Sequence, residues 1–134
     1  MANGTIAFDT LQTSGQITGT AKSLDTDYVV NGSVKAWFDI NSVGTALDDS
    51  FNISSLDDDA VGDRGLNYTN SFSTVHAAIS LGNEDNTSGG VISSDITTGS
   101  RTTGGFGIEA YYTSSNARVL YDTSSSGTVN GDLA

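Results

Sequence analysis

The sequence predicts an all-β protein with an antiparallel β-sandwich or jelly-roll-like fold. First, apolar and polar residues alternate over short stretches, which is the period of a strand with one buried face. Second, about eight to ten such stretches follow each other at short intervals, separated by turns rich in Gly, Ser, Thr and Asn. Third, no window of about a dozen residues shows the helical period.

The clearest strand is expected over Ser33–Asn41. Phe38 and its alternate neighbours face one side, while Lys35 and Trp37 fall on the side that should meet water. An Asn31-Gly32 turn before it is a typical hairpin signal. The other expected strands are Ile6–Leu11, Tyr28–Val30, Ala46–Leu56 with Leu47, Phe51 and Ile53 on one face, Leu66–Phe72, Val75–Leu81, Val91–Ile96, Phe106–Tyr112 and finally Ala117–Tyr121.

The segments between these strands are expected to be turns and loops because they are polar and contain glycine. LDDDAVGDRG is expected to be a turn, and Gly82–Gly90 and Thr97–Gly105 are expected to be loops. The last stretch, DTSSSGTVNGDLA, is mostly polar and is expected to be a tail.

The length of 134 residues fits one domain. We expect residues 1–22 to form an N-terminal lead segment with the first strand, used for attachment or strand exchange, and residues 23–134 to form the sandwich domain. Apolar residues make up 36% of the chain, below the roughly 45–50% of an ordinary domain. We therefore expect a thin core whose stability is shared with partner chains.

The charge and cysteine content exclude several classes of function. Five basic residues stand against sixteen acidic ones, so the net charge of −11 disfavours nucleic acid and anionic lipid as partners. The chain has no cysteine and hence no disulfide or thiolate-metal site. Its start, MANGTIAFDT, lacks the features of a signal peptide, and no apolar run reaches the roughly 20 residues that span a bilayer. We expect synthesis in the cytoplasm and no membrane insertion.

An acidic cluster raises the question of calcium. Asp57, Asp59 and Asp63 are candidate Ca²⁺ ligands, because several carboxylates in one turn supply hard oxygen atoms. The EF-hand pattern fails, since Val61 and Tyr68 occupy positions that should ligate. A solvated acidic turn is the default interpretation, and no cofactor is expected.

No catalytic constellation is found, so we expect a non-enzymatic protein. Gly105–Ala110 matches the loose dinucleotide pattern G-x-G-x-x-A but lies within an alternating β-stretch rather than before a helix. His76 is the only histidine, and no nucleophile elbow or second metal ligand accompanies it.

Aromatic residues outside the apolar stripes are candidate contact residues, since aromatics on a polar face are typical of protein interfaces and sugar platforms. We assign Trp37 and Lys35 to a subunit interface and Tyr111 and Tyr112 to contact with a receptor, near the Gly82–Gly90 and Thr97–Gly105 loops.

SLDTDYVVNGSVKAWFDIN, followed by LDDSFNISSLDDDAVGDRGLNYTNSF, resembles a module of tail-fibre and minor structural proteins of tailed bacteriophages, marine ones especially. The shared pattern is a K-A-W strand, D-S-F-N-[IV]-S-S, an acidic turn with glycine, and G-[LD]-[NY]-x-x-N-[FY]. The resemblance covers Ser23–Phe72, with shorter matches at GTIAFDTLQ and GDLA. The part after Phe72 departs from the usual longer β-rich tips.

The resemblance implies a virion structural protein, a short tail fibre or part of one, assembled as a homotrimer. Its implied partners are other phage tail or capsid proteins and a glycan or protein of the host cell surface. In a homotrimer, threefold symmetry can bury Trp37 between protomers. Two alternatives stay open: a capsid decoration or head-fibre protein, and a carbohydrate-binding module.

Overall fold

The computed structural model describes residues 10–13, 22–25, 32–84 and 92–134, and the chain divides into two units, residues 1–33 and 34–134. In the first unit, β1 (Thr10–Thr13) pairs with β2 (Lys22–Asp25) in antiparallel fashion. The expected strand Tyr28–Val30, most of Ile6–Leu11 and Asn31 lie outside the described residues.

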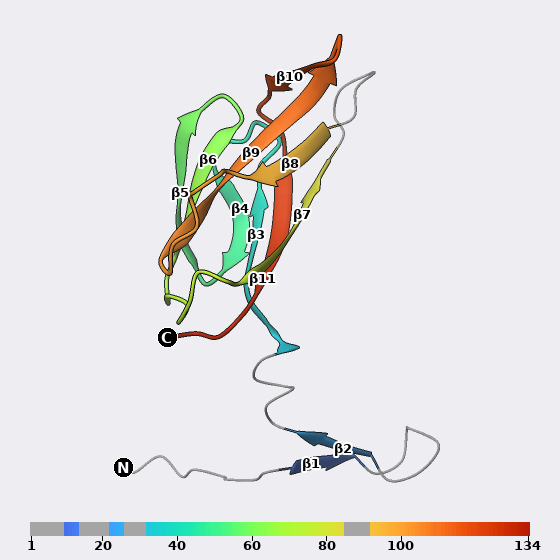
Figure 1. Ribbon diagram of the computed structural model, residues 1–134, viewed down its shortest axis with the longest axis vertical. Helices are drawn as coiled ribbons and strands as arrows, with labels where there is room; N and C mark the ends of the chain where they lie inside the picture. Colours follow the sequence, from blue (N-terminus) through green and yellow to red (C-terminus); the bar gives the residue numbers. More distant parts are fainter. Residues whose placement is uncertain (1–9, 14–21, 26–31, 85–91) are drawn as a thin grey trace. The chain divides into compact units, whose positions relative to one another are not determined.

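The second unit confirms the predicted all-β sandwich, because two antiparallel sheets pack against each other (Figure 1). No helix in the described ranges has the length and hydropathy of a membrane span. The strands of this unit are β3 (Val34–Ile40), β4 (Leu47–Phe51), β5 (Ile53–Ala60), β6 (Asp63–Tyr68), β7 (Ala78–Asn83), β8 (Ile92–Ile96), β9 (Gly105–Ser114), β10 (Ala117–Leu120) and β11 (Ser125–Asn130).

The four-stranded sheet has the order β4-β3-β11-β7. Its clearest strand is β3, in which Ala36, Phe38 and Ile40 are buried while Trp37 faces outward, as the alternation predicts. β11 lies between β3 and β7 and supplies the buried Val129.

The five-stranded sheet has the order β10-β9-β6-β5, with β8 paired to the other edge of β9. β9 is the longest strand, and one of its edges is shared: Gly105–Glu109 pairs with β6, and Tyr111–Ser114 pairs with β10. Ala110 joins the two partners, since its N–H donates to Gly62 O and its carbonyl accepts from Tyr121 N–H.

The core fills the space between the two sheets. Phe38 of the four-stranded sheet meets Phe106 of the five-stranded sheet with ring centroids 6.1 Å apart. Tyr68 packs against Phe72 at 4.6 Å, and the backbone of Phe72 forms an isolated bridge with Leu133. These aromatic rings anchor a small but continuous apolar interior.

The expected strand Ala46–Leu56 is wrong as a single element. Asn52 adopts a left-handed conformation with φ of 57° and separates β4 from β5, which belong to different sheets. Asn tolerates this conformation better than most residues do. Phe51 is consequently exposed, whereas Ile53 is buried, so the two do not share a face.

Two polar segments also form strands where none was expected. In LDDDAVGDRG only Val61 and Gly62 make the turn, and the acidic run lies in β5, an edge strand. The predicted polar tail contains β11, an interior strand of the four-stranded sheet. Hydroxyl side chains can occupy such positions when they are satisfied, and Ser125 Oγ hydrogen-bonds Asn83 Oδ1 at 2.9 Å.

One end of the sandwich holds an ion pair between a buried arginine and a partly exposed aspartate. Arg64 is fully buried, and its Nη2 lies 3.3 Å from Asp122 Oδ1, which also accepts a hydrogen bond from Gly62 N–H at 2.7 Å. Gly44, with φ of 75°, lies against the guanidinium group at a place where a side chain would collide with it. Asp122 thereby connects the β5–β6 turn to the segment that leads into β11.

Candidate functional site

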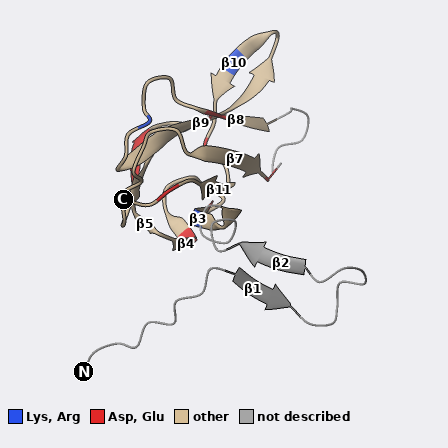
Figure 2. Cartoon of the chain, turned by 60° about the horizontal axis from the view of Figure 1, so that its bottom comes forward, with Lys and Arg blue, Asp and Glu red and all other residues tan. Residues whose placement is uncertain are grey.

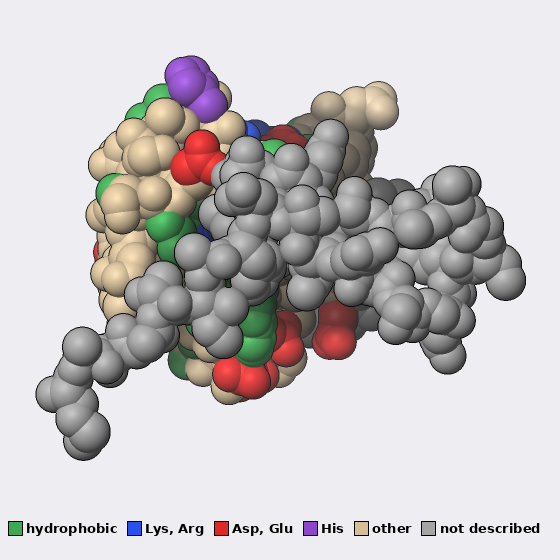
Figure 3. All heavy atoms as spheres, turned by 90° about the horizontal axis from the view of Figure 1, so that it is seen from below, with side chains coloured by type: hydrophobic (Ala, Val, Ile, Leu, Met, Phe, Trp, Pro, Cys, Tyr) green, Lys and Arg blue, Asp and Glu red, His purple; other side chains and the backbone are tan. Residues whose placement is uncertain are grey.

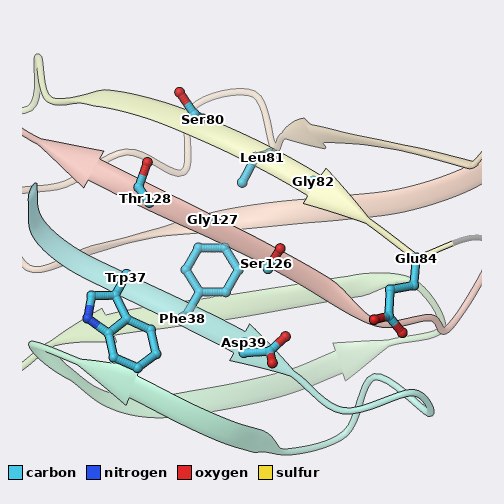
Figure 4. Close-up of a pocket in the computed structure, with 10 residues that line it drawn as sticks. All are labelled: Trp37, Phe38, Asp39, Ser80, Leu81, Gly82, Glu84, Ser126, Gly127 and Thr128. Atoms are coloured by element: carbon cyan, nitrogen blue, oxygen red, sulfur yellow. The ribbon is translucent and has the colours of Figure 1, made fainter.

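An open groove of about 620 Å³ crosses the outward face of the four-stranded sheet (Figure 4). Its residues come from β3, from β11, and from β7 with the residue that follows it. The lining consists of Trp37, Phe38, Asp39, Ser80, Leu81, Gly82, Glu84, Ser126, Gly127 and Thr128. No residue of β4 contributes, so the groove occupies the half of the sheet away from that edge.

The groove exists because short side chains lie between two larger ones. Ser126 on β11 lies opposite Asp39 on β3 and opposite Gly82 on β7. Across these three strands, the position on β7 therefore has no side chain to fill the groove. Trp37 lies at one end of the groove and Glu84 at the other (Figure 4). The small residues between these two larger ones leave the hollow.

Trp37 also marks a second feature, an aromatic row toward β4. It lies directly opposite Phe51 on β4 and Thr128 on β11. The exposed fractions are 36% for Trp37 and 55% for Phe51, so two large aromatic side chains meet water side by side. Lys35, two residues before Trp37 on β3, is partly buried. We call Phe51 and Trp37 the aromatic row.

The electrostatics of this face are negative. Asp39 and Asp49 lie directly opposite each other across β3 and β4, and both are exposed. Glu84 adds a third carboxylate at the far end of the groove. No basic residue lines the groove. Acidic residues outnumber basic ones in the chain. Figure 2 marks where the charged residues of the described ranges lie along the ribbon. The site therefore offers hydrogen-bond acceptors and repels anions.

Tyr111 and Tyr112 do not join the groove, because both lie on β9 in the other sheet. The Tyr111 ring lies under the guanidinium of Arg118 at 4.0 Å, and its hydroxyl donates to Asp95 Oδ2 at 2.9 Å. Tyr112 packs edge-on against Tyr121 with centroids 5.7 Å apart. As consecutive strand residues, the two tyrosines point to opposite faces and form no common contact surface.

Of the two expected contact loops, the structure describes Thr97–Gly105, which follows β8. Of Gly82–Gly90, residues 85–90 lie outside the described residues. Receptor contact through these loops stays a prediction.

The candidate calcium ligands lie on two paired strands. Asp57 and Asp59 are on β5, with carboxylate oxygens beside Gly65, and Asp63 begins β6. Asn67 Nδ2 donates to Asp57 Oδ2 at 2.8 Å. In the described ranges, no group of three or more His, Cys, Asp or Glu side chains is arranged to hold a metal ion. Charges on an edge strand protect it from pairing with another chain, which gives the acidic run a structural role.

His76 is exposed, as Figure 3 shows. It borders a separate hollow of about 400 Å³. Val75, Thr97 and Arg101 line the same hollow, and Arg101 Nη1 donates to Ala77 O at 3.1 Å. The G-x-G-x-x-A stretch Gly105–Ala110 lies inside β9, which is followed by a hairpin to β10 and not by a helix. The glycine stretch therefore lacks the strand–turn–helix context of a dinucleotide loop.

No family model, curated protein or solved structure matches the chain.

Proposed function

We propose that this chain is a non-enzymatic structural protein of a tailed bacteriophage particle, a short tail fibre or a component of one. The K-A-W and S-F-N-x-S-S resemblance over Ser23–Phe72 supports the class of protein. The observation that carries the proposal is the aromatic row, because exposed neighbouring aromatics on a sheet face are typical of a surface that meets another protein. The protein would work in the virion after synthesis in the host cytoplasm.

The proposed partner at the aromatic row is a second copy of this chain within a homotrimer. Phe51 lies on β4, a short edge strand, and it is exposed beside the exposed Trp37. Burying such residues against a neighbour removes apolar area from water, at roughly 25 cal/mol per Å². Lys35 lies on the same strand as Trp37 and is assigned to the same interface. Closed threefold symmetry then repeats the contact around one axis.

The native mass tests the assembly. The full chain is expected to show about three times its mass of 13.8 kDa, for example by light scattering after gel filtration. Phe51→Ser is expected to lower the mass to that of one chain. The matched control is Val61→Ser, which removes a similarly exposed apolar residue from the β5–β6 turn of the other sheet and is expected to remain trimeric. A wild-type chain that stays monomeric at micromolar concentration would contradict the homotrimer.

The position on the particle tests the phage role. Antibodies against the purified chain are expected to label tail fibres of the virions in immunoelectron microscopy. Label on the capsid would support the decoration or head-fibre alternative instead. Absence of label from purified virions would refute the structural role, and it would leave a free carbohydrate-binding module as the better interpretation.

A further inference from the structure

We propose that the groove between Trp37 and Glu84 binds a neutral sugar unit. This inference deepens the proposed function and rests on it for the source of the ligand, an uncharged glycan of the host cell surface. Its physical basis is independent of the phage assignment, because it comes from the groove itself. The volume of about 620 Å³ lies within the range of small-molecule sites.

Trp37 supplies the apolar contact that a sugar needs. One face of a pyranose ring consists of C–H groups, and an exposed indole gives such a face a flat, rigid surface at low entropic cost. Trp37 lies at one end of the groove and pairs in register with Thr128 on β11, and its indole ring extends from β3 toward β4 (Figure 4). Trp37 is the one residue that the groove shares with the aromatic row, whereas Phe51 does not line the groove, so both sites can be used only if the neighbouring copy packs mainly on Phe51.

The remaining lining supplies polar partners suited to hydroxyl groups. Asp39 presents two carboxylate oxygens that can accept from neighbouring sugar hydroxyls, while Ser126 and Thr128 can both donate and accept. Within the part of the chain that the structure describes, no hydrogen bond occupies the side-chain oxygens of these three residues. Hydrogen bonds to a carboxylate are stronger than those between neutral groups, so Asp39 is expected to contribute most.

Charge selects among sugars. The groove has two carboxylates and no basic residue, and Asp49 lies directly beside Asp39. An acidic sugar such as a sialic or uronic acid would bring a further negative charge to this face, and the net charge of −11 adds to the repulsion. The expected ligand is therefore a neutral hexose or N-acetylhexosamine.

Gly82 provides a way to block the site without disturbing the fold. A Cβ added at this position would meet only Ser126 Oγ, at 3.5 Å, which is ordinary van der Waals contact. Gly82 lies beside Ser126, which lies beside Asp39, so Gly82→Leu would place a large side chain next to these two residues in the groove. Thr113→Leu is the matched control, because it adds a leucine at an exposed position of β9 in the other sheet.

The experiment titrates the full chain with glucose, galactose, mannose, N-acetylglucosamine and N-acetylneuraminic acid. Trp37 is the only tryptophan, so its emission reports directly on the groove, and saturation-transfer NMR gives a second readout. At least one neutral sugar is expected to bind with millimolar affinity. Asp39→Asn is expected to weaken binding about tenfold, the value of one charge-assisted hydrogen bond. Trp37→Ala and Gly82→Leu are expected to abolish NMR-detected binding, while Thr113→Leu binds like the wild type.

The outcomes separate this inference from the proposed function. Absence of binding to every neutral sugar tested, binding unchanged in Gly82→Leu, or preference for N-acetylneuraminic acid would each overturn the neutral-sugar site, whatever the native mass and particle position show. Phe51→Ser is expected to bind the same sugar as the wild type, because Phe51 does not line the groove. If this monomeric variant loses binding while it remains folded, the groove as described here is wrong.

Discussion

The ring of Phe38 occupies the space that a side chain at Gly127 would need. The two residues lie opposite each other on β3 and β11, and a Cβ built on Gly127 would fall 2.7 Å from both Cε1 and Cζ of the ring. The same Cβ would come within 2.8 Å of Ser80 O on β7. The absence of a side chain at Gly127 therefore lets the Phe38 ring reach Phe106 across the core.

Gly127→Ala is expected to destabilise the protein by about 1–3 kcal/mol, the usual cost of overpacking a core. Backbone and a buried ring surround the added methyl group, so neither neighbour can yield easily. The measurement is the free energy of unfolding in urea. Gly82→Ala on the neighbouring strand is the control and is expected to change stability little, because its new contact is at 3.5 Å. Equal effects of the two substitutions would argue against this packing.

Asp49→Asn is expected to stabilise the fold by about 0.2–1 kcal/mol. Asp49 lies directly opposite Asp39 on the neighbouring strand, so the substitution removes the repulsion between two like charges. The amide oxygen of the new side chain can still accept the hydrogen bond that Asp49 Oδ1 receives from Ser50 N–H. The gain should shrink in high salt, which screens exposed charges. Urea unfolding at low and high ionic strength checks this, with Asp48→Asn as the control that is not opposite an acid.

Asp122→Ala is expected to cost about 3 kcal/mol or more, because it leaves the buried Arg64 guanidinium without its counter-charge. Nε and Nη1 of Arg64 have no hydrogen-bond partner in the described part of the chain, so no other contact there can compensate for the loss of Asp122. Asp132→Ala, at an exposed position, is the control. Arg64→Met combined with Asp122→Asn should cost less than Asp122→Ala alone, since it removes both charges together. Thermal unfolding that ranks these variants otherwise would contradict the role of the pair.

Tyr68 is expected to make the protein sensitive to alkali. Burial raises the pKa of its hydroxyl from 10.0 to about 12, partly offset by the charge of Arg101. Between these values the unfolded chain loses the Tyr68 proton while the folded chain keeps it, so the free energy of unfolding falls as pH rises from about 10 to 12. Below pH 10 this contribution is fully present. The difference in free energy of unfolding between wild type and Tyr68→Phe should be constant at neutral pH. Between pH 10 and 12 the wild type should lose stability relative to Tyr68→Phe. A difference that stays constant up to pH 12 would refute the raised pKa of Tyr68.

Strands with a regular alternation and a strong apolar stripe could be predicted from the sequence. The expected Ser33–Asn41 contains β3, and the expected Phe106–Tyr112 lies within β9. β11 could not be found in this way, since Val129 is its only large apolar residue. The residue of β11 opposite Phe38 must be glycine, because the Phe38 ring fills the space that a side chain there would need. The alternating apolar residues that usually indicate a buried strand are therefore missing from β11.

Only part of the candidate site could be predicted from the sequence. Alternation on β3 places Trp37 and Asp39 on one outward face. Their neighbours Ser126 and Gly82 come from strands far away in the sequence, and which strands become neighbours depends on long-range pairing that local patterns do not reveal. Glycine and serine in polar segments look like ordinary turn residues until the pairing is known.

The pairing of β3 with β11 also constrains the order of events during biosynthesis. β3 opens the sandwich unit and β11 is its final strand, yet the two are hydrogen-bonded neighbours. On the ribosome, β3 can find β4 early, but its other edge must wait until translation has passed Asn130. The four-stranded sheet therefore cannot be completed until β11 has been synthesised, although β3 and β4 are made much earlier.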